Sequence, residues 1–441
     1  MDYISNTPKD IEEMLKVIGA GGIDDLFTDI PSSVGLNRDI SLPAPLTEIE
    51  AGELLTEIAG KNCVLKSFIG AGAYNHYIPA VVDHLASRSE FYTAYTPYQP
   101  EVSQGTLTAI FEFQTLICRL TGMDITNASM YDGATSLAEA VFMAVRSNNR
   151  NAVVVSDAVH PHYRQVLDAY AGVSGIEVRT LKSKEGVTDI ESLEALMDDT
   201  VSAVVVQNPN FFGCLEDLGN IADAAHNHKS YLITVVTEPM SLGILKSPGA
   251  QGADIVCGEG QSLGNPAGFG GPLLGILAAK DSFLRKMPGR LVGKTTDADG
   301  KEAYVLTLQT REQHIRRDRA TSNICTNQGL CALRSVLYMT LLGNTLRDLA
   351  DLNHRLASYL KQRLTEKGFT PVFTRPFFNE FVLAFNDAER VRAALRNDCY
   401  QLGVPLGDYY PEHKNSLLLC ATEMNSPDDI DRLVQAIERA V

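Results

Sequence analysis

The sequence is poor in positive charge. It has 38 Lys and Arg residues against 54 Asp and Glu residues, which gives a formal net charge of −16. This balance argues against nucleic acid or an anionic membrane surface as the main partner. No apolar run approaches the ~18 residues of a membrane-spanning helix, and the N-terminal stretch MDYISNTPKDIEEML contains no apolar core of a secretory signal. We therefore expect a soluble, cytoplasmic protein.

Metal-binding cysteine patterns are also absent. The eight cysteines form no CxxC pair and are scattered through apolar stretches, which predicts reduced, buried thiols. His160 and His162 are not at a helical ligand spacing, and no cluster of cysteines or carboxylates accompanies them. We expect no metal site.

The rest of the composition is ordinary for a globular protein, with 45% hydrophobic and 21% charged residues. At 441 residues the chain is too long for one ordinary core. Residues 66–310 alternate between apolar β-branched runs and helical stretches, which predicts a large α/β domain with a mostly parallel sheet between two layers of helices. The expected strands are 153–156, 203–206, 231–236 and 254–257, and helices are expected at 161–171 and 217–228.

Two smaller parts flank this domain. Residues 1–65 are expected to form an N-terminal helical arm that packs on a larger body. Residues 311–441 predict a small α+β C-terminal domain. Its expected elements are helices over 326–365 and near 387–398, strands at 370–373, 380–385 and 416–420, and a last helix capped by Ser426.

Polar residues lie where such a sheet binds ligands, at the carboxyl ends of its strands. Transferases of the aspartate-aminotransferase type hold pyridoxal phosphate (PLP) there with a helix N-terminus, a stacking ring, a carboxylate and a lysine. The segment 131–140 opens an apolar helix, and Ser136 with Glu139 predicts a capping box. His160 and Glu238 follow expected strands and are candidates for the ring and the carboxylate. Plain structural roles as caps or turn residues are the alternatives.

The lysine of such a site is missing. Residues 247–279 contain none, and a Schiff base needs a primary amine. Lys246 and Lys280 border this stretch, and Lys246 reads as a surface lysine. An independent PLP enzyme that uses one of these two lysines is one alternative.

Three segments resemble one known family. Residues 92–105, YTAYTPYQPEVSQG, strongly resemble a signature of the P-protein of the glycine cleavage system, glycine dehydrogenase (decarboxylating). Residues 68–79, FIGAGAYNHYIP, resemble the family segment that precedes it. Residues 313–317, QHIRR, and 320–328, ATSNICTNQ, resemble a later signature. The resemblance implies a PLP-dependent transferase fold of the aspartate-aminotransferase type (fold type I).

The resemblance also implies a division of labour. In one branch of the family two chains, alpha and beta, share the work, and this chain resembles alpha. Counting back from Gly270-Gly271-Pro272, Gln261 stands where the Schiff-base lysine of beta would be. The resemblance implies an alpha-two beta-two assembly in which beta carries PLP and this chain holds none covalently. The family reaction decarboxylates glycine and passes the aminomethyl group to the lipoyl arm of the H-protein.

The signature at 92–105 is the expected working surface of this chain. Its aromatic and amide groups, stiffened by two prolines, suit packing on the PLP of beta and binding of glycine's carboxylate. The hypothesised contributors to the shared site are Tyr95, Tyr98, Gln99, Ser103 and Gln104. An interface loop without a catalytic part is the alternative.

A second polar cluster follows the basic stretch at 316–319. Thr321, Ser322 and Asn323 are candidates for contacting the cofactor, and arginines beside them suit a phosphate or a carboxylate. A solvated basic face is the alternative. For the chain as a whole, the rival hypothesis is a non-catalytic scaffold that stabilises beta or docks the H-protein.

Overall fold

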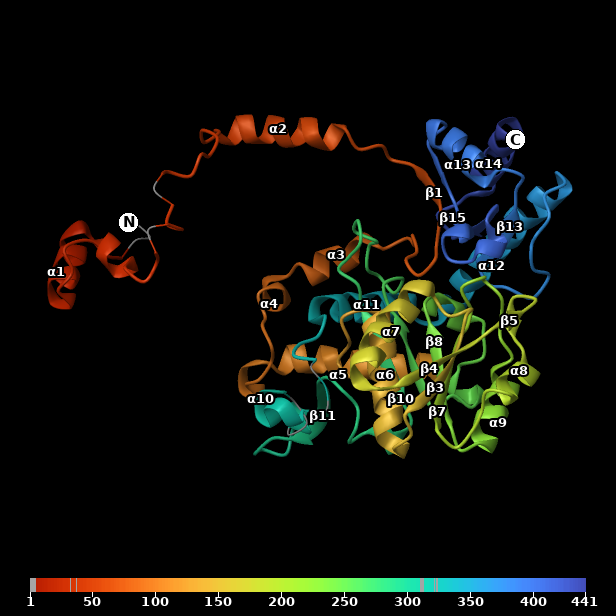
Figure 1. Ribbon diagram of the computed structural model, residues 1–441, viewed down its shortest axis with the longest axis horizontal. Helices are drawn as coiled ribbons and strands as arrows, with labels where there is room; N and C mark the ends of the chain where they lie inside the picture. Colours follow the sequence, from red (N-terminus) through yellow and green to blue (C-terminus); the bar gives the residue numbers. More distant parts are fainter. Residues whose placement is uncertain (1–4, 32, 37, 310–312, 321, 323) are drawn as a thin grey trace. The chain divides into compact units, whose positions relative to one another are not determined.

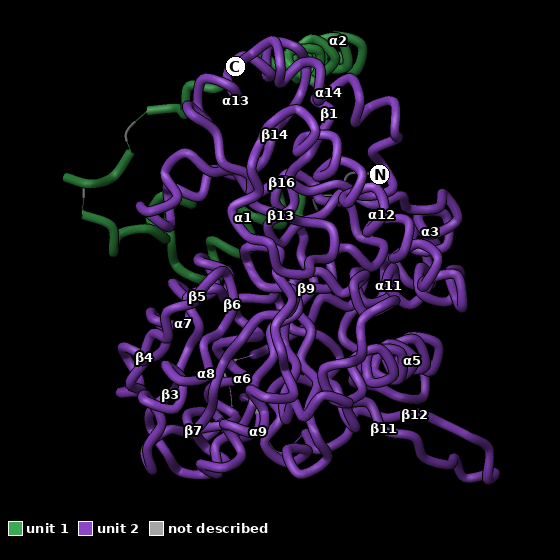
Figure 2. Tube along the Cα trace, turned by 90° about the vertical axis from the view of Figure 1, so that its right-hand side faces the viewer, with its two compact units in different colours: residues 1–63 green, residues 64–441 purple. Residues whose placement is uncertain are grey.

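The computed structural model describes residues 5–31, 33–36, 38–309, 313–320, 322 and 324–441. The chain forms two compact units, residues 1–63 and residues 64–441, which Figure 2 colours separately. The large sheet, the helices around it and both candidate sites belong to the second unit. The three-part division expected from the sequence stays a prediction.

The first unit consists of short helices without a core. α1 (Pro8–Ile18) and α2 (Glu48–Gly60) flank the 3₁₀ turn η1 (Ile23–Phe27). Thr7 and Thr47 cap the two α-helices, each in a reciprocal capping box. None of the described residues of this unit is buried. Its helices are therefore held by local caps and not by packing within the unit.

A seven-stranded sheet forms the centre of the second unit (Figure 1). Its order is β2-β10-β9-β8-β7-β3-β4. The strands β9, β8, β7, β3 and β4 are parallel to one another, and β10 is antiparallel to both β9 and β2. The bounds are Ile125–Thr126 for β2, Ala152–Ser156 for β3, Glu177–Leu181 for β4, Val201–Gln207 for β7, Tyr231–Val236 for β8, Ile255–Glu259 for β9 and Gly275–Ala279 for β10.

Helices cover both faces of this sheet. α6 and α7 share a core with Val153 and Val155 of β3, whereas α5, α9 and α11 share the opposite core with Val154. Burial on both faces explains why these strands read as continuous apolar runs. The predicted three-layer α/β architecture is confirmed. The bounds are Gln104–Thr121 for α5, Gly133–Asn148 for α6, Pro161–Ser174 for α7, Leu218–Asn227 for α9 and Gly329–Leu342 for α11.

The C-terminal part is a smaller α+β layer with its own core. β13, β16 and β15 form a three-stranded antiparallel sheet, and β1 pairs in parallel with β14. Ser426 caps α14, as predicted. The bounds are Lys66–Phe68 for β1, Leu346–Glu366 for α12, Glu380–Ala384 for β13, Ala388–Asn397 for α13, Tyr400–Leu402 for β14, Val404–Pro405 for β15, Ser416–Cys420 for β16 and Pro427–Ala440 for α14.

Short elements connect these parts. α4 leads into the 92–105 segment, and a hairpin of β11 and β12 lies beside α5. The bounds are Ala80–Ala86 for α3, Ser89–Tyr92 for α4, Ser183–Lys184 for β5, Val187–Thr188 for β6, Ile190–Glu194 for α8, Leu291–Thr296 for β11, Glu302–Thr307 for β12 and Gln313–Arg316 for α10.

Several expectations need correction. The predicted strand at 370–373 is a single bridge between Pro371 and Leu383, because a proline lacks the N–H that a longer ladder needs. The helical stretch 326–365 is two helices, separated at Gly343, whose φ is 50°.

Not all thiols are buried: the exposed ones are Cys63, Cys325 and Cys399. These three residues lie outside the strands and helices that form the cores. Apolar neighbours in the sequence were therefore not enough to predict that their thiols are buried. No helix in the described ranges combines the length and apolarity that a membrane crossing needs.

Candidate functional site

The residues predicted for a cofactor cavity meet at one edge of the sheet. His160 follows β3, Glu238 follows β8 and Gln261 follows β9. Gln207, the last residue of β7, joins them and accepts from His160 N at 2.8 Å. All four side chains are buried. Parallel strands end at the same edge, which brings together residues that are far apart in the sequence.

Gln261 is held by the chain itself. Its Oε1 accepts a hydrogen bond from Tyr74 N at 2.8 Å, and its Nε2 donates to Tyr74 O at 3.1 Å. The two bordering lysines are elsewhere. Lys246 is exposed, and Lys280 forms an ion pair at 2.6 Å with Asp254, which precedes β9 at the opposite end of the strand.

The carboxylate predicted to meet the pyridine nitrogen, that of Glu238, is paired with a histidine. Glu238 Oε2 lies 3.0 Å from His76 Nε2, and Glu238 Oε1 accepts from Ser262 Oγ at 2.9 Å. His76 Nδ1 lies 2.9 Å from a carboxylate oxygen of Glu423. Burial alone would lower the pKa of His76, but the charges and hydrogen bonds of the two carboxylates outweigh it and raise this pKa to about 10. His76 is therefore an imidazolium between two buried carboxylates.

His160 contacts the same part of the chain. Its Nδ1 accepts from His162 N at 3.2 Å, which caps α7. Its Nε2 therefore carries the proton and donates to Ala71 O at 2.9 Å. Burial lowers the pKa of His160 to about 4, so the ring is neutral. Tyr163 and Phe211 pack against the ring, with centroid distances of 4.8 and 4.9 Å.

The predicted phosphate position, the N-terminus of α6, is taken by a carboxylate of this chain. Glu259 Oε2 accepts from Gly133 N at 3.0 Å. Glu259 Oε1 accepts from Gln261 N at 3.1 Å and from Leu274 N at 2.7 Å. Burial raises the pKa of Glu259 to about 8, although the three N–H donors act in the opposite direction.

The predicted capping box of Ser136 and Glu139 is wrong. α6 begins at Gly133, and Asp132 is its cap: Asp132 Oδ1 accepts from Thr135 N at 2.8 Å, and the Thr135 hydroxyl accepts from Asp132 N at 3.3 Å. The helix starts earlier than expected because Asp132 offers an equally good capping oxygen one turn before Ser136.

The residues of this cavity do not fit PLP. The cofactor needs a free amine, open N–H groups at the helix N-terminus and a carboxylate open to the pyridine nitrogen. Gln261 has no amine, the N–H of Gly133 is engaged by Glu259, and Glu238 is paired with His76. Side chains of the same chain take each of these positions.

The second candidate site is the segment 92–105. Tyr95 is 85% exposed and Gln99 is also exposed, whereas Pro97 between them is buried. Ser103 is half-buried at the start of α5. The segment thus presents polar groups outward from an anchored backbone.

A buried arginine beside β11 holds this segment in place. Arg290 is 3% exposed, and its Nη2 donates to Tyr98 Oη at 3.1 Å and to Cys325 O at 2.8 Å. Its Nη1 donates to Thr326 Oγ1 at 3.0 Å and to Asn327 Oδ1 at 3.3 Å. The guanidinium also lies over the Tyr98 ring, 5.4 Å from its centroid. Arg290 therefore joins the two signature segments.

Gln104 anchors the other end of the segment. Its Nε2 donates to Pro100 O at 2.8 Å and to Tyr304 O at 2.9 Å, and its Oε1 accepts from Tyr304 N at 2.9 Å. The amide is thus occupied by the backbone of β12. Its predicted contribution to a shared site stays a prediction, and its contacts favour a holding role.

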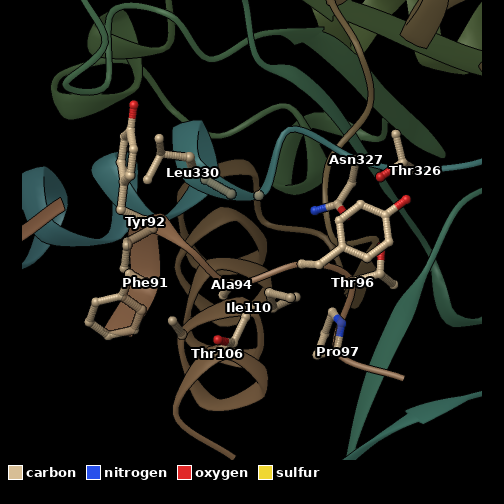
Figure 3. Close-up of a pocket in the computed structure, with 15 residues that line it drawn as sticks. Phe91, Tyr92, Ala94, Thr96, Pro97, Thr106, Ile110, Thr326, Asn327 and Leu330 are labelled. Atoms are coloured by element: carbon tan, nitrogen blue, oxygen red, sulfur yellow. The ribbon is translucent and has the colours of Figure 1, made fainter. Parts of the chain in front are cut away.

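A pocket of about 260 Å³ lies between the two signature segments (Figure 3). Phe91, Tyr92 and Leu330 lie on the left of the view, and the right-hand side holds Thr96, Pro97, Thr326 and Asn327. Segments far apart in the sequence therefore line one pocket, and Tyr95 belongs to its wall.

The second polar cluster is described in part. Thr321 and Asn323 lie outside the described residues. Ser322 is half-buried, and its Oγ accepts from Ile324 N at 3.1 Å. Together with Glu139 it lines a separate hollow of about 780 Å³. The basic stretch at 316–319 is exposed.

Sequence reasoning missed three residues that organise these sites: His76, Glu259 and Arg290. His76 lies inside the segment 68–79, whose resemblance to the family was its only signal. Glu259 ends a strand that reads as apolar, and Arg290 lies in no motif, so nothing in the sequence marked either of them.

Comparison with known proteins identifies the family. The family model for the glycine cleavage system P-protein matches residues 1–437. A protein of Moorella thermoacetica named probable glycine dehydrogenase (decarboxylating) subunit 1 is 51% identical over 440 residues, 99% of each chain. A protein of the same name from Bacillus cereus (strain AH187) is 51% identical over 437 residues, 98% of each chain.

Solved structures agree. An inhibitor-bound glycine decarboxylase (P-protein) of the glycine cleavage system matches with a TM-score of 0.91 and 47% identity over 100% of both chains. A glutamate decarboxylase of Lactobacillus brevis matches with a TM-score of 0.68 and 12% identity, over 92% of this chain and 95% of that one. The predicted fold, that of the fold type I PLP-dependent transferases, is confirmed. The chain belongs to the P-protein family of the glycine cleavage system.

Proposed function

We propose that the chain acts in the glycine cleavage system as the first subunit of a glycine dehydrogenase (decarboxylating), and that it completes an active site whose PLP is carried by the second subunit. Family membership and the names of its relatives support the enzyme and the need for a second subunit. The observation that carries the division of labour is the filled cavity at Gln261, Glu238 and Glu259. The side chains that this chain contributes to catalysis then lie outside that cavity.

The 92–105 segment is the proposed contribution to the shared site. Tyr95 and Gln99 are exposed on a backbone anchored by Pro97, and Tyr98 is held by Arg290. A phenol and an amide in fixed positions suit the binding of a small carboxylate and the exclusion of water around it. Glycine would be positioned by these groups beside the cofactor, which supplies the electron sink for loss of CO2 when it is bound to the partner.

The proposed partners follow from this arrangement. The second subunit binds over the 92–105 surface in an alpha-two beta-two assembly, and the lipoylated H-protein accepts the aminomethyl group. The 260 Å³ pocket beside Thr96 and Thr326 is part of the same surface. Ser322, with Thr321 and Asn323, is the proposed second contact to the cofactor.

Substitution of Tyr95 tests the catalytic proposal. Tyr95→Phe and Ser103→Ala are assembled separately with the second subunit, and glycine decarboxylation is measured with lipoylated H-protein. A hydrogen bond to a charged group contributes about 1.5–3 kcal/mol, so we expect kcat/KM to fall at least about tenfold for Tyr95→Phe. Tyr77→Phe is the matched control, because Tyr77 is similarly exposed at 61% but lies outside the segment.

Assembly is checked by size-exclusion chromatography of each mixture. Intact assembly with wild-type rates for both segment variants would make 92–105 an interface loop only. Full activity of the second subunit without this chain would make the chain a scaffold, and either result would contradict the proposal.

A further inference from the structure

The cavity that would hold PLP in this fold is crossed by one short stretch of the chain. We define the plug segment as residues 71–76, which precede α3. It contacts three residues at the carboxyl ends of the strands: Ala71 O accepts from His160, Tyr74 N and O bond to Gln261, and His76 pairs with Glu238. The segment lies where the stacking ring, the Schiff-base position and the pyridine carboxylate converge.

The plug segment is itself firmly attached. Glu380 from β13 accepts from Ala71 N at 2.6 Å and from Tyr74 Oη at 2.8 Å. Glu423 accepts from Tyr77 N at 2.7 Å and lies against His76. Tyr74 and His76 are 1% and 6% exposed. The contacts come from the large sheet and from the C-terminal part, and they bury Tyr74 and His76 while Ala73 and Asn75 stay exposed.

The hydrogen bonds at the two ends of the site also match those that the missing cofactor would make. His76 presents an N–H cation to Glu238, as a pyridinium nitrogen would to its carboxylate partner. Glu259 presents a carboxylate to Gly133 N at the start of α6, as a phosphate would. An ordinary buried ion pair accounts for the His76–Glu238 contact alone, and an ordinary hydrogen bond at a helix N-terminus accounts for the Glu259–Gly133 contact alone. Neither accounts for both contacts occurring where this fold places the two ends of the cofactor.

We propose that the plug segment and Glu259 form an internal substitute for PLP, in which the imidazolium of His76 replaces the pyridinium and the carboxylate of Glu259 replaces the phosphate. The cavity is then closed to cofactor whatever residue stands at position 261. The substitute also fixes the chain that leads through α3 and α4 into the 92–105 segment. This inference rests on the contacts within this chain and not on the proposed function.

Inorganic phosphate tests the Glu259 end of the substitute. Removing the carboxylate in Glu259→Ala leaves three buried N–H groups, from Gly133, Gln261 and Leu274, that an oxyanion can accept. The midpoint of thermal unfolding of the full-length variant is measured against phosphate concentration, with chloride at equal ionic strength as reference. We expect phosphate to raise the midpoint by about 2 °C or more in the variant and not in the wild type.

Glu216→Ala is the matched control, because it removes a buried carboxylate that accepts hydrogen bonds from Thr188 N and Asn210 Nδ2 and contacts neither the plug segment nor α6. It should lose stability without gaining a response to phosphate. Equal phosphate responses in wild type and Glu259→Ala, or none in Glu259→Ala, would overturn the proposal.

A lysine at the Schiff-base position tests the plug segment independently, even where Glu259→Ala folds poorly. The full-length Gln261→Lys variant is incubated with PLP, reduced with borohydride and mapped by peptide mass. We expect no pyridoxyl label at position 261 and no visible absorbance of bound cofactor, as in the wild type. A labelled peptide at that position would show that the cavity is open and would refute the substitute.

Discussion

Replacing Arg290 by methionine removes the contact that joins the two signature segments. Methionine keeps much of the apolar volume but loses the hydrogen bonds to Tyr98, Cys325, Thr326 and Asn327. At about 0.5–1.5 kcal/mol each, these four bonds contribute roughly 2–6 kcal/mol. Removing a buried charge that has no carboxylate partner among the described residues offsets part of this loss. We expect the free energy of unfolding to fall by only about 1–2 kcal/mol.

The catalytic rate of the folded complex should also fall, because Tyr98 and the 92–105 backbone lose the contacts that hold them in place. In the assembled complex we expect kcat/KM for Arg290→Met to drop about tenfold or more, with an intermediate value for Arg290→Lys, which retains the charge and fewer hydrogen bonds. Urea unfolding measures stability, and amide hydrogen exchange across 92–105 measures the order of the segment.

Arg164→Met is the matched control. Arg164 is half-buried, donates to Val159 O and Tyr410 Oη, and lies over an aromatic ring as Arg290 does, but it contacts neither signature segment. It should lower stability and leave the rate per folded complex unchanged. Wild-type activity and wild-type exchange at 92–105 in Arg290→Met would refute the reasoning.

Three further outcomes are expected. Because the pKa of His76 is raised, its ion pairs stabilise the fold fully below pH 6.5 and lose that effect as the pH rises towards 10. The free energy of unfolding should therefore fall by on the order of 3 kcal/mol between pH 6 and pH 10, and it should fall by less in His76→Gln. Gln104→Ala removes the hydrogen bonds to the backbone of Tyr304 in β12, so it should lower the midpoint of thermal unfolding. The absorbance spectrum of the cofactor in the complex should not change. Tyr98→Phe removes one hydrogen bond to Arg290 and should reduce kcat/KM by less than Arg290→Met in the same assay.

The sheet could be predicted because its signal is local. Strands such as β7 and β8 are buried on both faces, and that burial appears directly as a run of β-branched residues. The helix after Ser426 was equally visible, because the cap and the acidic first turn are adjacent in the sequence. The strand expected at 370–373 failed because pairing depends on its neighbour as well as on its own residues.

The filled cavity could not be predicted, because its contacts join distant residues. His76 and Glu238 are 162 positions apart, and Gly133 and Glu259 are 126 apart. The absence of a lysine from residues 247–279 was visible in the sequence. The groups that take the place of the cofactor were not visible in the sequence, because nothing near His76 or Glu259 indicates which residue each will contact in the fold.

The central claim is that this chain completes a cofactor site that it does not itself contain. Borohydride reduction of the active complex with its second subunit, followed by peptide mass mapping of both chains, tests it most directly. The account predicts a pyridoxyl group on a lysine of the second subunit and none on this chain. A pyridoxyl group on Lys246, Lys280 or any other lysine of this chain, at a stoichiometry that follows activity, would contradict it.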